Sequence, residues 1–264
     1  MTYLEYLLLF IIIPSIIILV LSLLISSTRQ YPIPVKTLVL SMVSLSVIAF
    51  VYTTPWDNYL VANGIWTYNS SKIIGIIFGY VPFEEYMFFI LETAFVCLFF
   101  SLFLQLGLIK IPDESNIHFS KLKILILLFL SFVWIFSLIT FIIELNQLLY
   151  LNLLVLWVIP PVFLQIFIGW DVISYNKSKI GIIILILGSY LSITDAYAIN
   201  TGIWSISQSF TTGLIFYGLP LEELMFFFST VILIIFGYIL IYFYSNKYLL
   251  TNKINSTKFN VFPS

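Results

Sequence analysis

The sequence contains seven apolar runs, each long enough to cross a membrane as a helix, which takes about 20 apolar residues. The runs cover residues 4–25, 37–54, 82–105, 122–142, 148–169, 180–197 and 219–243. Charged residues make up 9% of the 264 residues and hydrophobic residues 61%, whereas about 25% of the residues in a soluble domain are charged. We therefore predict an all-α polytopic membrane protein with seven transmembrane helices.

The basic residues predict the orientation of these helices. Ten of the eleven fall in alternate connections or in the C-terminal tail: Arg29, Lys36, Lys110, Lys121, Lys123, Lys177, Lys179, Lys247, Lys253 and Lys258. Only Lys72 falls on the other side. Because short loops rich in Lys and Arg stay in the cytoplasm, we expect a multi-pass protein of the cell membrane with its N-terminus outside and its C-terminus in the cytoplasm. The formal net charge of -1 gives no reason to expect a nucleic-acid partner.

One block of the sequence occurs twice. Residues 57–89 recur as residues 195–227, and every matched position is 138 residues apart. Each copy reads Asp-x-Tyr-(x4)-Gly-Ile-Trp and continues to Pro-x-Glu-Glu-x-Met-Phe-Phe. The copies lie at the starts of the third and seventh spans, so an even number of crossings separates them and both face the same side. Such repeats are related by an axis along the membrane normal.

This duplication predicts the domain organisation. Residues 1–106 form a first unit of three helices, and residues 146–244 form a second. Residues 107–145 contain a linking helix and its loops, because two units that face the same way need an odd number of crossings between them. Residues 245–264 form a polar cytoplasmic tail.

The repeated acids lack partners of opposite charge. Asp57, Glu84, Glu85, Asp195, Glu222 and Glu223 all fall at the predicted outer end, where Lys72 is the only cation. Crowded carboxyl groups in an apolar setting are expected to stay partly protonated. Each Glu pair follows a proline expected at the first helical position, where a proline and nearby acids favour a helix start. A helix over residues 73–104 would be about 48 Å long, so we expect a break ahead of the prolines.

Several aromatic residues are candidates to support the acids. Phe88 and Phe89, like Phe226 and Phe227, follow the two Glu residues of their copy by four positions and so share a helix face with them. Trp66 and Trp204, with Tyr59 and Tyr197, are candidates either for the site or for the aromatic belt at the membrane surface.

Three further acids leave alternatives open. Asp57 and Asp195 are candidate general bases or partners of the Glu residues, and a turn-forming role is an equal alternative. Glu92 lies on the same helix face as Glu85, but the second copy has Thr230 at this position. The two copies are therefore not chemically equal.

Paired acids beside aromatic faces suit proton-initiated chemistry on alkenes. A protonated carboxyl group donates H⁺ to a double bond, and the carbocation is stabilised by aromatic rings, by about 2 kcal/mol or more per desolvated ring. A base then removes a different proton. The reaction is a net isomerisation and needs no redox cofactor.

At these residues the chain resembles the fused lycopene cyclases of archaea, some bacteria and fungi. The shared features are Pro82–Glu85 and Pro220–Glu223 with the upstream Asp and Gly-Ile-Trp elements. The resemblance implies a lycopene β-cyclase that closes the linear ends of lycopene at an interface between the two repeats. It also implies that the acid and the base are among Glu84, Glu85, Glu222 and Glu223. The sequence does not distinguish the acid from the base.

Cofactors, partners and rival functions follow from the same residues. The chain lacks the Gly-x-Gly-x-x-Gly fingerprint of dinucleotide-binding proteins, so we expect no flavin or nicotinamide cofactor, and no metal site is predicted. The expected partners are a linear carotenoid, membrane lipid and other enzymes of the carotenoid pathway. The alternatives are a carotenoid hydratase that uses the same protonation and a small proton-coupled transporter.

Overall fold

The computed structural model describes residues 1–26, 35–112 and 120–259, with side chains described up to residue 247. The helices are α1 (Tyr3–Leu7), η1 (Leu8–Ile12), α2 (Ile13–Ser26), α3 (Val35–Ala62), α4 (Phe83–Gln105), α5 (Lys121–Ile142), η2 (Asn146–Leu148), α6 (Leu149–Ile173), η3 (Ser174–Asn176), α7 (Lys177–Asn200), η4 (Gln208–Phe210) and α8 (Leu221–Phe259). The strands are β1 (Trp66–Tyr68), β2 (Ile77–Phe78), β3 (Val81–Pro82), β4 (Trp204–Ile206), β5 (Ile215–Phe216) and β6 (Leu219–Pro220).

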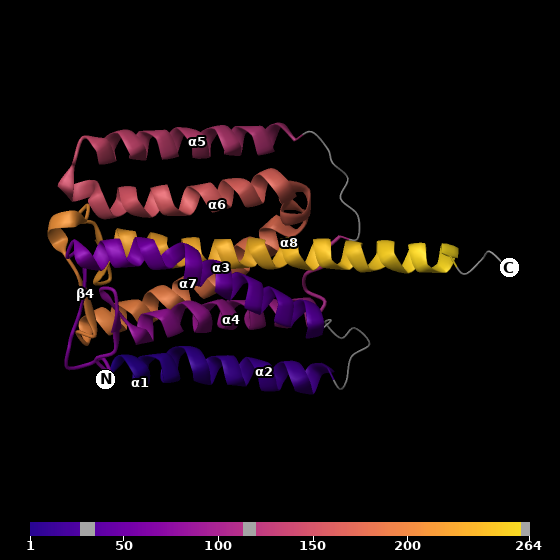
Figure 1. The fold of residues 1–264 in the computed structure, drawn as a ribbon, viewed down its shortest axis with the longest axis horizontal. Coiled ribbons are helices and arrows are strands. Elements are labelled where there is room, and N and C mark those ends of the chain that lie inside the picture. Colours follow the sequence, from indigo (N-terminus) through magenta and orange to yellow (C-terminus); the bar gives the residue numbers. More distant parts are fainter. Residues whose placement is uncertain (27–34, 113–119, 260–264) are drawn as a thin grey trace.

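Seven helices in the described ranges are long and apolar enough to cross a membrane. The first of them is continuous from α1 through η1 into α2, over Tyr3–Ser26. They lie side by side as one bundle (Figure 1), which confirms the predicted all-α polytopic membrane protein. The largest departures from the predicted apolar runs are at the ends of two helices. Helix α3 continues through Pro55 to Ala62, and α8 extends to Phe259, past the end of the bundle in Figure 1.

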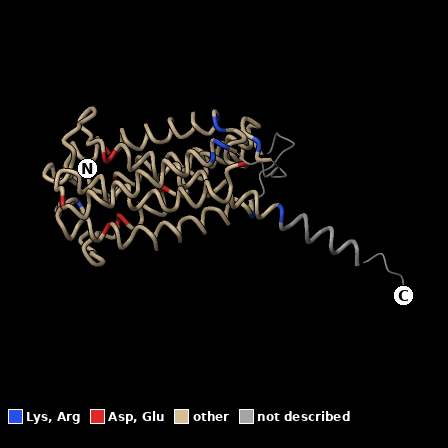
Figure 2. The backbone as a smooth tube through the Cα atoms, turned by 90° about the horizontal axis from the view of Figure 1, so that it is seen from above, with Lys and Arg blue, Asp and Glu red and all other residues tan. Residues whose placement is uncertain are grey.

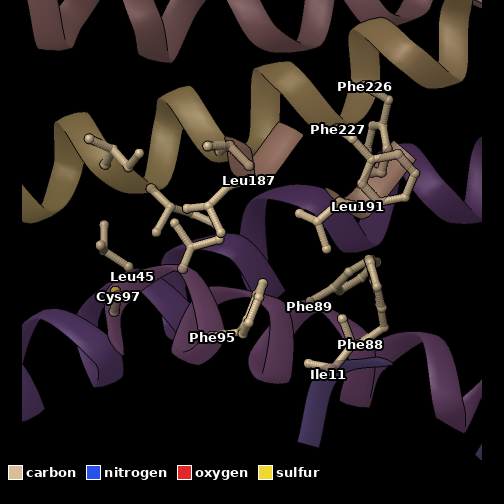
Figure 3. Packing of buried hydrophobic residues seen from close by; sticks show 14 of the residues in the cluster. Ile11, Leu45, Phe88, Phe89, Phe95, Cys97, Leu187, Leu191, Phe226 and Phe227 are labelled. Carbon is tan, nitrogen blue, oxygen red and sulfur yellow. The ribbon is translucent and has the colours of Figure 1, made fainter. Parts of the chain in front are cut away.

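Helices α4 and α8 form the centre of the bundle. Helix α4 packs against α2 and α3, α8 packs against α6 and α7, and α4 and α8 also contact each other. The linking helix α5 packs against α6. Figure 3 shows the apolar contacts between the two halves, in which Phe88 and Phe89 of α4 approach Phe226 and Phe227 of α8. The two copies of the repeated block thus meet at the core.

A short hairpin precedes each central helix and provides the predicted break. Strand β2 pairs with β3 before α4, and β5 pairs with β6 before α8. Gly79 turns the first hairpin with a φ of +67°, and a Cβ atom there would lie 2.1 Å from Asn58 Oδ1. The expectation that the prolines occupy the first helical position is wrong by one residue. Pro82 lies in β3 as the extended residue that caps α4, which begins at Phe83.

The two copies are also joined directly by a pair of strands. Strand β1 of the first copy pairs antiparallel with β4 of the second, with Thr67 opposite Ser205. The hydroxyl groups of these two residues lie 2.7 Å apart. Because Thr67 and Ser205 are matched positions of the repeat, they lie on the axis that relates the copies. The repeats therefore meet both in the core and at one end of the bundle.

Charge divides the bundle into two ends. Figure 2 shows the described Lys residues other than Lys72 gathered at the end that α8 extends beyond, and most Asp and Glu residues at the end with the N-terminus. Lys72 lies at the acidic end, where its ammonium group donates to the carbonyl oxygen of Thr201 and not to a carboxyl group. Ten cations were predicted to share one side. Three of them, Arg29, Lys253 and Lys258, are not among the residues whose side chains are described.

Candidate functional site

A narrow cavity with a volume of about 20 Å³ lies between the two halves at the acidic end. Three carboxyl groups line it, those of Glu85, Asp195 and Glu223. The rest of the wall is almost wholly aromatic: Tyr3, Trp66, Tyr68, Phe88, Trp204, Phe226 and Phe227, with Ile206. Glu85 and Glu223 are matched positions of the repeat, so each half contributes the same carboxyl group to one shared space.

Glu85 is held by tyrosines of the first half. It lies in the first turn of α4 and is 4% exposed. The hydroxyl group of Tyr3, at the start of α1, donates a hydrogen bond to Glu85 Oε2. Tyr68 at the end of β1 lies beside the same carboxyl group. Burial, and then the nearby carboxyl groups of Asp57 and Glu85, raise the pKa of Tyr68 well above its usual value, so its hydroxyl group keeps its proton.

Glu223 has an equivalent setting in the second half. It lies in the first turn of α8 and is 3% exposed. The hydroxyl group of Tyr150, near the start of α6, donates to Glu223 Oε1 over 2.7 Å. Trp66 comes from the first half and lies beside this carboxyl group. Each Glu of the cavity thus has a tyrosine donor from the first helix of its own repeat.

Glu84 and Glu222 do not line this cavity, although both are fully buried. Glu84 Oε1 accepts a hydrogen bond from the backbone N–H of Ile74 over 2.5 Å. Glu222 Oε1 accepts one from the backbone N–H of Thr212 over 2.7 Å. Both bonds join a central helix to the segment before its hairpin, and both span ten residues. The first Glu of each pair therefore holds the loop, and the second faces the cavity.

Asp57 and Asp195 lie inside α3 and α7 and are buried. The alternative that they form turns in the loops is therefore wrong. Helix α3 continues past its predicted apolar run to include Asp57, and Asp195 already lies within the predicted run of residues 180–197. Asp195 Oδ1 accepts a hydrogen bond from Trp204 Nε1 over 2.8 Å. Neither oxygen of Asp57 has a hydrogen-bond partner among the described residues. The two aspartates thus occupy matched places with different surroundings.

Glu92 and Thr230 meet each other across the two halves. The Thr230 hydroxyl group donates to Glu92 Oε1 over 2.7 Å, and the two residues are matched positions of the repeat. Both are buried between α4 and α8. The difference between Glu92 and Thr230 that the sequence shows therefore allows a hydrogen bond across the axis between the repeats.

The aromatic candidates separate into two groups. Phe88, Phe226, Phe227 and the two tryptophans Trp66 and Trp204 line the cavity. Phe89 is buried beside a second cavity, deeper in the bundle, that also contains Glu92. Tyr59 and Tyr197 are 44% and 47% exposed, so they suit the aromatic belt. For the tryptophans the belt interpretation is wrong, because they face the carboxyl groups.

Sequence reasoning missed Tyr3, Tyr68 and Tyr150. The first helix of each repeat carries a sparse signal, Tyr-(x6)-aromatic-(x3)-Pro, at Tyr3, Phe10 and Pro14 and again at Tyr150, Trp157 and Pro161. These positions are 147 residues apart and not 138, because the first unit has a longer connection between its first two helices. A search for a repeat with one fixed offset does not align them.

Comparison with known proteins assigns the family. The chain is 32% identical to the lycopene beta-cyclase of two strains of Halobacterium salinarum, over 74% of its own length and 79% of theirs. It is 30% identical to the bifunctional lycopene cyclase/phytoene synthase of Gibberella fujikuroi and 31% identical to that of Podospora anserina. These matches cover 76% and 78% of the chain but only 34% and 36% of the fungal proteins.

No family model and no solved structure matches the chain. The similarity to the Halobacterium enzymes is nevertheless high enough in identity and coverage to establish descent from a common ancestor. It covers 197 residues, or 74% of the chain. The chain belongs to the lycopene β-cyclase family.

Proposed function

We propose that the protein is a lycopene β-cyclase that converts the linear ψ-ends of lycopene to β-ionone rings. The observation that carries this proposal is the pairing of Glu85 with Glu223 in one buried, aromatic cavity. The function of the relatives agrees with it, because the matched Halobacterium proteins are lycopene beta-cyclases. The enzyme is thus an isomerase that leaves the redox state of its substrate unchanged.

The reaction needs one proton donor and one proton acceptor. A carboxyl O–H adds its proton to C2 of the C1=C2 double bond and leaves a cation at C1. The electrons of the C5=C6 bond then form the C1–C6 bond, which closes the ring and moves the cation to C5. A carboxylate removes the proton from C6, and the electrons of that C–H bond restore the C5=C6 bond. General acid–base catalysis of this kind contributes about 10²–10⁴-fold.

Glu85 and Glu223 are the reacting carboxyl groups in this proposal, and Glu84 and Glu222 position them. Tyr3 and Tyr150 hold the reacting groups in place through their hydroxyl donors. Asp195 lines the same cavity. Either Glu can act as the acid and the other as the base.

The aromatic wall serves the cation that forms between the two proton transfers. Phe88, Phe226 and Phe227 present apolar faces to the cavity. A cation over such a ring gains about 2 kcal/mol or more when water is excluded. The same wall keeps water from the cation, so ring closure competes well with hydration. No flavin, nicotinamide or metal enters these steps.

The proposed setting is the cell membrane, with the N-terminus outside and the C-terminus in the cytoplasm. The charge asymmetry between the two ends of the bundle supports this orientation. The substrate, a linear carotenoid, dissolves in the same lipid that surrounds the helices. Other enzymes of the carotenoid pathway are the proposed partners in the membrane.

Expression in a bacterium that accumulates lycopene tests the proposal. Chromatography of the pigments should show γ-carotene or β-carotene in cells that carry the protein. A hydroxylated carotenoid product would show that the protein is a hydratase and not a cyclase. Unchanged lycopene in cells whose membranes contain the protein would contradict the proposal.

A further inference from the structure

A second cavity, with a volume of about 100 Å³, lies deeper in the bundle than the carboxyl cavity. It is enclosed by α3, α4, α6 and α8, and the Phe226 ring lines both cavities. Phe226 and Leu45, two of its wall residues, are labelled in Figure 3. Phe226 therefore lies between the carboxyl cavity and this deeper space.

The deeper cavity borders a groove between α3 and α6. Ile48, Tyr52 and Trp157 line both the cavity and the groove. The groove is open at the surface of the bundle, because Val47 and Val51 on its α3 side are 57% and 64% exposed. In a membrane these two residues face the acyl chains.

The rings along this route stack on one another. The polar atoms of Trp56 and Tyr52 bond to backbone carbonyl oxygens, whereas Trp157 Nε1 has no hydrogen-bond partner among the described residues. The Trp56 ring lies 4.8 Å from that of Trp157 and 5.8 Å from that of Phe226, both stacked. Trp56 Nε1 donates to the Leu153 carbonyl oxygen over 3.0 Å, and the Tyr52 hydroxyl group donates to the Trp157 carbonyl oxygen over 2.8 Å. Apolar ring faces are thus left to line the path.

We propose that the groove and the deeper cavity form a lateral portal through which the linear carotenoid enters from the lipid. This proposal rests on the proposed function, because it takes the carboxyl cavity as the place of reaction. The ψ-end passes between α3 and α6, moves Phe226 aside and reaches Glu85 and Glu223. The rest of the polyene occupies the deeper cavity and the groove.

The occupant follows from continuity and chemistry. The route joins the lipid to the carboxyl cavity through shared wall residues, and its outer walls are apolar. A long hydrocarbon that is dissolved in the bilayer loses little by entering such a route, whereas entry through the polar end of the bundle would expose it to water. Apolar pockets with few polar groups are also the usual form of small-molecule sites.

The matched place in the other half differs at its rings. Tyr190 repeats Tyr52 and donates to the carbonyl oxygen of Phe10 over 2.8 Å. Phe10 stands where the second half has Trp157, and Thr194 stands where α3 has Trp56. The stacked tryptophan pair therefore belongs to the side between α3 and α6.

Filling the portal tests the proposal. Ala49 lines the deeper cavity, and Ala49→Trp should obstruct it. Val51→Trp obstructs the mouth of the groove at a lipid-facing position, where a larger side chain does not disturb the core. Val43→Trp is the matched control, because Val43 lies on the same helix, is 58% exposed and lines neither the cavity nor the groove.

Two readouts are measured with the full-length protein in liposomes that contain lycopene. The first is the initial rate of lycopene consumption. The second is visible circular dichroism, recorded in the Glu85→Gln background, because achiral lycopene acquires a signal only when a chiral site holds it. We expect Ala49→Trp to lower the rate at least tenfold and remove the signal, Val51→Trp to lower the rate about threefold, and Val43→Trp to change neither.

The outcomes separate the portal from the reaction. Unchanged rates in Ala49→Trp and Val51→Trp would overturn the portal. If the parent protein binds lycopene without converting it, the proposed function fails, and loss of the signal in Ala49→Trp alone would still support the portal. A signal that persists in Ala49→Trp, or no signal in the Glu85→Gln protein, would overturn it. If Ala49→Trp does not reach the membrane, the rate of Val51→Trp is the test: a loss of about threefold supports the portal, and an unchanged rate overturns it.

Discussion

The two repeats hold their glutamates in the same way but differ in the partners of their aspartates. In both, a Glu accepts from a backbone N–H ten residues earlier, and a tyrosine of the first helix donates to the next Glu. The differences lie at the aspartates, since Trp204 donates to Asp195 but Asp57 has no described partner. Duplication thus supplied two equal carboxyl groups, and later changes made their surroundings unequal.

The axis between the repeats shows the same division. Thr67 and Ser205 face each other as a pair of similar hydroxyl groups, whereas Glu92 faces Thr230 as an acceptor facing a donor. A reaction with one proton donor and one acceptor needs two carboxyl groups in different states. A fully symmetric cavity would not distinguish them. The unequal neighbours of Glu85 and Glu223 provide that distinction.

The strongest test of the comparison removes the two cavity carboxyl groups separately. Glu85→Gln and Glu223→Gln should each lower the rate of ring closure by at least about 100-fold, because proton transfer contributes about 10²–10⁴-fold. The measurement is product formed per amount of protein in the membrane. Glu5→Gln is the control, because Glu5 is exposed at the same end of the bundle. Full activity in both cavity variants would contradict the assignment.

The tyrosine donors should have smaller and similar effects in the two halves. Tyr3→Phe and Tyr150→Phe each remove one hydrogen bond to a cavity carboxyl group. A hydrogen bond contributes about 1 kcal/mol, so we expect a rate about fivefold lower in each variant. Tyr59→Phe, at a half-exposed position, should leave the rate unchanged. A large effect in only one half would show that the two Glu residues depend on their donors unequally.

The loop-holding glutamates should affect stability more than the reaction. Glu84→Gln and Glu222→Gln keep an oxygen that can accept from Ile74 and Thr212, so both variants should retain most of their activity. Glu84→Leu and Glu222→Leu leave that N–H without its partner and should lower the free energy of unfolding by about 1–3 kcal/mol. Thermal unfolding in detergent measures this difference. Complete loss of activity in well-folded Glu84→Gln would instead make Glu84 a reacting group.

The smallest effect is expected at the strand pair on the axis. Thr67→Ala and Ser205→Ala remove an exposed hydrogen bond, so each should lower stability by less than about 1 kcal/mol. The double variant should cost no more than either single one, because both remove the same bond. Unfolding of the three variants measures this coupling. Additive losses would show that the bond contributes nothing.

Much of the fold could be predicted from the sequence, because the membrane restricts a span to a long apolar helix. The seven spans and the break before Pro82 follow from run lengths and from the length of a helix. The ends of α3 and α8 were missed, because apolar runs report contact with lipid and not where the backbone stops being helical. The cross-repeat pair of β1 and β4 was also missed, since three-residue strands have no periodicity to detect.

The candidate site was predicted in part. The repeat identified all four Glu residues, but it did not separate Glu85 from Glu84. That distinction depends on which way each side chain points from the first turn of α4, and neighbouring residues point about 100° apart on a helix. Tyr3 and Tyr150 reach the acids only through the packing of the bundle. Their contribution is therefore a tertiary property that spacing along the chain does not reveal.

The most direct test of the account is the reaction carried out in D₂O. If a carboxyl group of the cavity exchanges with solvent and then protonates C2, each new ring should carry one deuterium, at C2, as mass spectrometry and NMR of the purified carotenoid would show. No deuterium should appear at C6, because that carbon loses its hydrogen when it becomes part of a double bond. Rings formed without deuterium would contradict proton-initiated closure by an exchangeable carboxyl group.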